Sequence, residues 1–397
     1  MDWKTVWTRQ RGRLLIALAI SVLGLMLRVN LAINGPIEWD EPVYLDAAVM
    51  YAQDIRSGDW HHLLTTTYNY EHPILFKVLY GAVLSIRKPA PDLNGGNMGA
   101  DGLIKSSPYY PRLLSLRLVS VGFGTLAVFL LSLINPFAGL LLAIQTLAVK
   151  YTSVIYLESL PLMLSLISVA AFTRVRTVFQ DPTPLTRSQI RWLILSAVCL
   201  GLAVASKFIF GLAGLAIALD MLLLGRLRLG RTIRWMALWS TLVLVCFLAA
   251  DPVVLSDPAG HFVGSIRYSV NYSQNDYSVR NKAYPFWQPL EWLALSITRQ
   301  STALNPFFLR PGNFWIALDE IFLPLAALGA WRLSQKNRTF AIWLAVGLAF
   351  LLIWNTKWPQ YTLAIMPPYC LSAALGLEQI AAWLSKRRLF ASRPHTA

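Results

Sequence analysis

The chain has 397 residues, of which 56% are hydrophobic and only 14% are charged, whereas a soluble domain carries about 25% charged residues. This balance and the long apolar runs exclude an ordinary soluble protein and predict an all-α, polytopic membrane protein. The net charge of +15 does not predict nucleic-acid binding, because the basic residues lie between apolar runs, where the positive-inside rule expects them. Three cysteines lie inside apolar runs and show neither a disulfide framework nor a metal-ligand spacing: Cys199, Cys246 and Cys370.

Apolar runs of about 20 residues, with roughly 17 to 25 tolerated, are long enough to span a bilayer. The first run follows a basic N-terminus that resembles a signal peptide in charge. It is too long for one and no small-residue cleavage site follows, so we predict an uncleaved first span. We predict about ten spans (roughly 9 to 12) in one transmembrane domain, 1–397, without a separate soluble domain: 13–33, 112–134, 136–151, 155–173, 191–207, 209–225, 235–250, 314–331, 339–355 and 361–383.

Basic residues between these spans predict the orientation. With the N-terminus in the cytoplasm, every second connection is basic, namely 174–191, 226–234, 332–338 and the C-terminal tail. The positive-inside rule then predicts that both termini are cytoplasmic and that the number of spans is even. The long polar segments 34–111 and 251–313 are expected outside, and the protein is expected in the cell (cytoplasmic) membrane.

The first outer loop, 34–111, begins with the acidic pair Asp40-Glu41. Pro42 suits the first turn of a helix, apolar residues then recur at helical spacing, and Gly58 is a plausible end. This pattern predicts an amphipathic helix along the outer membrane surface, whose dipole stabilises the two carboxylates at its N-terminus. The alternative is that one of them only caps the helix.

A second polar cluster, Glu71-His72-Pro73, follows about thirty residues later. The apolar stretch 74–86 is too short for a span and predicts a re-entrant or interfacial helix that starts at the proline. Glu71 and His72 would then stand at its mouth, although a hydrogen-bonded structural role is the alternative for the histidine. The stretch 89–108, rich in Gly, Pro and Asn, is expected to be a mobile loop.

These elements resemble the C-type (GT-C) membrane glycosyltransferases, in particular the protein O-mannosyltransferase and aminoarabinose-transferase (ArnT-like) group. That group carries an outer Asp-Glu pair and a His-Pro-Pro-Leu-type motif, in which Ile74 replaces the second proline here. The later matches are Arg112 at the start of the second span, the run 201–207 ending in Lys207, and the segment with Lys357 and Tyr361 before the last span. The large C-terminal soluble domain of some members has no counterpart, which leaves acceptor recognition open.

The resemblance implies transfer of a sugar from a polyprenyl-phosphate-linked lipid donor to an acceptor hydroxyl at the outer face of the bilayer. We expect Asp40 to be the base, with Glu41 as second choice or as an orienting group. A single carboxylate implies inversion at the anomeric carbon, by the logic of inverting glycosidases. No cofactor is expected to be required. Asp40, Glu41, Glu71 and His72 offer ligands for a divalent cation, but nearby basic residues make it dispensable.

Cations on the face of Asp40 are expected to stabilise the departing phosphate: Lys77, Arg112, Lys207 and Lys357. A charge within or beside a span costs about 2.5–3.5 kcal/mol on insertion scales unless it is paired, so substrate binding is the first hypothesis. Snorkelling to the interface is the alternative for Lys207 and Lys357. Glu158, at the outer start of the fourth span, is expected to bind substrate or to pair with Lys150 or another cation.

Tyrosines and tryptophans in 251–313 are typical of an interfacial belt, or they form a lid over lipid and acceptor with Arg267, Arg280 or Arg310 near the phosphate. A transporter or flippase of lipid-linked saccharides is the alternative function, but no internal repeat supports it. A non-catalytic scaffold would leave the acidic pair unexplained. The sugar and the acceptor, whether protein, lipid or glycan, are not determined by the sequence.

Overall fold

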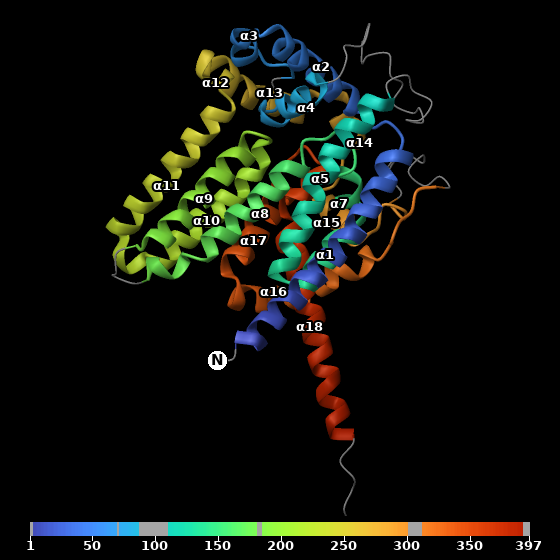
Figure 1. The fold of residues 1–397 in the computed structure, drawn as a ribbon, viewed down its shortest axis with the longest axis vertical. Coiled ribbons are helices and arrows are strands. Elements are labelled where there is room, and N and C mark those ends of the chain that lie inside the picture. The colour runs from blue at the N-terminus through green and yellow to red at the C-terminus, as the bar shows by residue number, and fades with distance from the viewer. Residues whose placement is uncertain (1–2, 70, 87–109, 181–184, 301–311, 392–397) are drawn as a thin grey trace, which may run out of the picture.

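The structure, a computed structural model, describes residues 3–69, 71–86, 110–180, 185–300 and 312–391, which form a helical bundle (Figure 1). Within these residues, four helices are long and apolar enough to cross a membrane. They are α1 (Trp3–Asn34), α5 (Tyr110–Ile134), α9 (Arg187–Val204) and α11 (Leu229–Ala250). The predicted helical membrane protein is therefore confirmed.

Five further helices complete the bundle: the shorter α8 (Ser159–Thr173), α10 (Leu212–Leu224), α16 (Phe322–Lys336) and α17 (Arg338–Ile353), and the 26-residue α18 (Met366–Ala391). Each of the ten predicted spans contains helical residues, but 136–151 is not one helix. It consists of α6 (Pro136–Ile144) and α7 (Thr146–Tyr151), because Gln145 leaves the helical conformation at ψ 121°. Its side chain accepts a hydrogen bond from the Ala148 amide at 2.6 Å, which starts α7 anew.

One end of the bundle is covered by short helices (Figure 1). These are α2 (Glu41–Ser57), α3 (Trp60–Thr65) and α4 (Leu75–Ser85), with α12 (Val253–Ser256) and α13 (Gly264–Asn275) beside them; α14 (Tyr277–Lys282) and α15 (Gln288–Ala294) follow along the chain. The start of α1 and the end of α18 lie at the opposite end of the bundle. We call the first end the capped end.

Local sequence signals account for the helices of the capped end. Gly58 ends α2 with φ 72°, as its position predicts, and α4 begins two residues after Pro73. Gly81 lets α4 pack against α2, since a Cβ there would lie 2.6 Å from the Tyr51 Cβ. The predicted loop 89–108 lies outside the described residues.

Candidate active site

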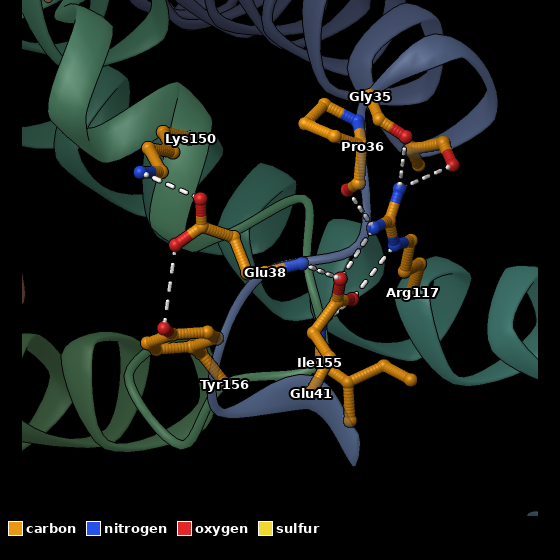
Figure 2. A network of polar contacts seen from close by, with 9 residues as sticks. Gly35, Pro36, Glu38, Glu41, Arg117, Lys150, Ile155 and Tyr156 are labelled. Carbon is orange, nitrogen blue, oxygen red and sulfur yellow. Dashed lines mark hydrogen bonds and ion pairs between the residues drawn. The ribbon is translucent and has the colours of Figure 1, made fainter. Parts of the chain in front are cut away.

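Glu41, the first residue of α2, is fully buried and faces the bundle (Figure 2). Its carboxylate forms an ion pair with Arg117 of α5, and the Arg117 Nε donates to it at 2.7 Å. The backbone amides of Glu38 and Ile155 also donate to this carboxylate, both at 2.8 Å. These contacts join α2 to α5 and to the buried segment before α8, so the geometry favours a structural role for Glu41 over that of a base or acceptor ligand.

Arg117 is a partner that sequence reasoning missed. Besides Glu41, its guanidinium donates to the carbonyls of Ala32 and Gly35 at 3.2 Å and to that of Pro36, which fixes the end of α1. The available signal was an arginine inside a predicted span, about two turns from the start of α5. A charge at that depth must find partners inside the protein.

Glu38 forms a second buried pair next to Glu41 (Figure 2). One of its oxygens lies 3.0 Å from the Lys150 ammonium, and the Tyr156 hydroxyl donates to the other at 3.4 Å. Lys150 therefore pairs with Glu38 and not with Glu158, the partner considered from the sequence.

Asp40 is partly exposed and lies at the N-cap position of α2, but its side chain makes no capping hydrogen bond. The capping alternative is therefore not observed. Burial by neighbouring groups raises the pKa of Asp40, the Lys207 charge lowers it, and the Glu38 charge raises it further. Asp40 thus lies within electrostatic reach of Lys207.

A cavity of about 460 Å³ opens at the capped end, between α10, α13 and α17. Four titratable groups that lie near one another line it, namely Glu71, His72, Lys207 and Tyr361, and Ser265 and Ser269 of α13 add two hydroxyls. Most of the remaining wall is apolar and includes Leu212, Leu215, Ile266, Val270, Phe350 and Trp354. The cavity therefore offers one polar region that continues into an apolar groove.

Lys207 is the buried cation of this polar region. It lies just after α9, forms an ion pair with Glu158, and its ammonium is 5.5 Å from the centre of the Tyr361 ring. Glu158 is completely buried at the start of α8. The pairing of Glu158 with a cation, one of its two predicted roles, is thus observed, with Lys207 as the partner.

Glu71 and His72 stand side by side at the cavity, with 3.7 Å between a Glu71 carboxylate oxygen and the His72 Nε2. Burial and the Asp40 charge raise the pKa of Glu71, whereas Lys207 and a hydrogen bond with Tyr268 lower it. Burial holds the pKa of His72 well below its usual value, and the charge of Lys207 adds to this effect. Both effects favour the neutral imidazole of His72, which has one N–H to donate.

Lys77 does not line the cavity. It is fully buried on α4, and its ammonium donates to the carbonyls of Tyr68, Asn69 and His72 at 2.7, 2.6 and 2.8 Å. An ammonium has three N–H groups, so all are committed to the backbone. This geometry does not support the expected contact of Lys77 with a substrate phosphate.

Lys357 is likewise committed to backbone carbonyls, those of Leu351, Leu352 and Trp354 at 3.1, 3.1 and 2.7 Å. It closes the C-terminus of α17 and does not line the cavity. Arg112, partly exposed on the first turn of α5, does not line it either. Among the expected cations, the structure thus brings Lys207 to the cavity, but not Lys77, Arg112 or Lys357.

Helix α13, from the second predicted outer segment, forms one wall of the cavity through Ser265, Ile266, Ser269 and Val270. This placement fits the predicted lid. Arg267 and Arg280 are exposed and do not line the cavity, and Arg310 lies outside the described residues. Across the described ranges, no three His, Cys, Asp or Glu residues gather as a metal site would require.

Comparison with known proteins gives one family match. The sequence model of the family "Dolichyl-phosphate-mannose-protein mannosyltransferase" matches residues 18–256. No curated protein matches the whole sequence at a significant level.

Solved structures show a similar fold at low sequence identity. ArnT from Cupriavidus metallidurans bound to undecaprenyl phosphate is 16% identical, with a TM-score of 0.58 over 93% of this chain and 60% of that chain. The archaeal oligosaccharyltransferase AglB from Archaeoglobus fulgidus, in complex with an inhibitory peptide and a dolichol-phosphate, is 13% identical with a TM-score of 0.50. That match covers 100% of this chain and 53% of AglB. The predicted GT-C fold is confirmed, and the chain spans about three-fifths of the length of ArnT.

Proposed function

This chain belongs to the dolichyl-phosphate-mannose-protein mannosyltransferase family, and on that premise we propose that it is a membrane glycosyltransferase. Its donor is a sugar linked through phosphate to a polyprenol, and its acceptor supplies a hydroxyl. The ArnT structure holds undecaprenyl phosphate and the AglB structure a dolichol-phosphate, which supports this class of lipid.

The observation that carries the proposal is the two-part cavity of about 460 Å³. A polyprenyl phosphate has an anionic head and an apolar chain. The head fits the polar region, where the ion pair with Glu158 engages one of the three Lys207 N–H groups, and neutral His72 adds another donor. The chain fits the apolar groove between α10, α13 and α17.

Asp40 does not line the cavity itself, but it lies within the electrostatic field of Lys207, which does, and this supports a role for Asp40 as the base. Asp40 takes the proton of the acceptor hydroxyl, whose oxygen attacks the anomeric carbon of the donor. The bond between that carbon and the phosphate oxygen breaks, and the polyprenyl phosphate leaves against Lys207. Attack opposite the leaving group inverts the anomeric carbon. The Glu71 carboxylate, beside His72, accepts a hydrogen bond from a hydroxyl of the sugar.

The capped end, with the cavity, faces the exoplasm in this proposal, and both termini are cytoplasmic. Two observations support this orientation. The basic connections between predicted spans alternate as the positive-inside rule requires. The start of α1 and the end of α18 lie at the end of the bundle opposite α2, α3 and α4 (Figure 1).

The test compares cell-envelope glycans and glycoproteins by mass spectrometry in cells that lack the protein and cells that express it. Wild-type protein and the control D46N, an acid on the same helix, should add one sugar to an envelope component. D40N should not, although it folds and binds undecaprenyl phosphate. Identical glycans with and without the wild-type protein would show that it is not a glycosyltransferase, while an active D40N would show that Asp40 is not the base.

A further inference from the structure

Lys77 is an internal cation whose contacts all go to one turn of the chain. This turn connects α3 to α4, and its carbonyls at Tyr68, Asn69 and His72 converge on the Lys77 ammonium within 2.6–2.8 Å. Backbone carbonyls that lose such a donor inside a protein cost free energy, because water no longer solvates them. The Lys77 ammonium thus supplies the hydrogen bonds that water would otherwise donate to these carbonyls.

The backbone of this turn has a strained conformation, which the Lys77 hydrogen bonds can stabilise. Asn69 has φ 58°, a left-handed conformation that costs energy in residues other than glycine, although asparagine tolerates it better than most. The turn carries Glu71 and His72, both of which line the cavity. The Lys77 contacts therefore decide where two cavity-lining side chains stand.

Asp251, at the end of α11, is a second anchor on the same turn. Asp251 is buried, and burial raises its pKa to about 6. The nearby charge of Lys77 and a hydrogen bond from the Ile74 amide limit this rise. A small gap of about 10 Å³ lies between His72, Asp251 and Ser265. Because α11 leads into α12 and α13, Asp251 connects the turn to the opposite wall of the cavity.

We propose that Lys77 is a positioning residue that holds the turn, and so Glu71 and His72, at the polar region of the cavity, and that Asp251 links this hold to the α13 wall. The proposal rests on the proposed function where it concerns the donor. Lys77 itself does not touch the donor.

Hydrogen exchange measured by mass spectrometry on the full-length protein in lipid nanodiscs tests the hold directly. In K77M, amides of the peptide 66–74 should exchange at least about tenfold faster than in wild type, since one lost charged hydrogen bond is worth about that factor. K77R, which keeps the charge and the donors, should restore part of the protection. The matched control is R56M, which removes a cation from the Leu84 and Ser85 carbonyls at the other end of α4.

The second measurement is binding of undecaprenyl phosphate, together with donor and acceptor KM values. K77M should weaken lipid binding and raise the donor KM by about tenfold while the acceptor KM stays unchanged, a split that general loss of folding would not produce. R56M should change neither. D251N should accelerate exchange in the same peptide to a smaller extent.

The outcomes separate the two proposals. Unchanged exchange of 66–74 in K77M overturns the positioning role, whatever the activity. Faster exchange with altered lipid binding, in a protein whose wild type transfers no sugar, supports the positioning role and contradicts the proposed function. If K77M does not fold, D251N decides, because wild-type exchange of the peptide 66–74 in D251N would overturn the proposal.

Discussion

Asp40 and Glu41 are neighbours in the sequence, but their carboxylates lie in different surroundings. Glu41 is enclosed against Arg117, whereas Asp40 is partly exposed and lies within the field of Lys207. A base must release and take protons in contact with an acceptor, which an enclosed, fully hydrogen-bonded carboxylate does not do. At the N-terminus of α2, Glu41 is therefore a structural acid and Asp40 a candidate catalytic one.

Removing Glu41 should destabilise the protein. E41A leaves the Arg117 guanidinium buried without its anion, and breaking a buried pair costs about 3–5 kcal/mol. Thermal unfolding in detergent should show a large fall in Tm. The double variant E41A/R117M should lose less than the sum of the single variants, because neither charge is left alone. Additive losses would argue against the pair.

The acid limb of the pH profile for sugar transfer should lie above the ordinary pKa of aspartic acid. Burial raises the Asp40 pKa, and the base works only when deprotonated, so kcat/KM should fall as the pH drops through that raised value. Lys207 stabilises the carboxylate. K207M should therefore move the acid limb to higher pH, whereas the distant control K336M should not move it. A shift to lower pH in K207M would contradict this assignment.

The apolar groove should discriminate donors by chain length. Leu215 lines the cavity, and L215W places an indole where the polyprenyl chain is proposed to lie. The KM for an undecaprenyl-linked donor should rise about tenfold, while a donor with two isoprene units should be less affected. L223W is the matched control, because Leu223 is exposed on the same helix and does not line the cavity. Equal effects of both variants on the long donor would place the chain elsewhere.

Lys357 should matter for stability. Its ammonium closes the C-terminus of α17 through three carbonyls, so K357M should cost about 1–3 kcal/mol through those unsatisfied acceptors. A lower Tm is the expected result. K357R should recover part of the loss, since arginine also donates to carbonyls. A normal Tm combined with weaker binding of undecaprenyl phosphate would instead indicate a direct contact with the lipid.

Much of the fold was predictable because its signals are local. The apolar runs specify helices through their length, Gly58 ends α2, and Pro73 precedes α4. The break at Gln145 was not predicted, because an uncharged residue inside an apolar run does not interrupt a hydropathy pattern. A side chain that caps its own neighbour restarts the helix there, and only backbone geometry reveals it.

Among the site residues, the sequence by itself determined the chemistry available: an acidic pair at a helix start, a Glu-His-Pro cluster, and cations beside apolar runs. Only the tertiary structure decided which of them face the cavity. Glu41 meets an arginine 76 residues away, and Lys207 meets Glu158, 49 residues away. Lys77 and Lys357 instead turn back to nearby carbonyls. In a low-dielectric interior a charge must be paired or hydrogen-bonded, and its partner is set by the packing of distant helices, which no local pattern encodes.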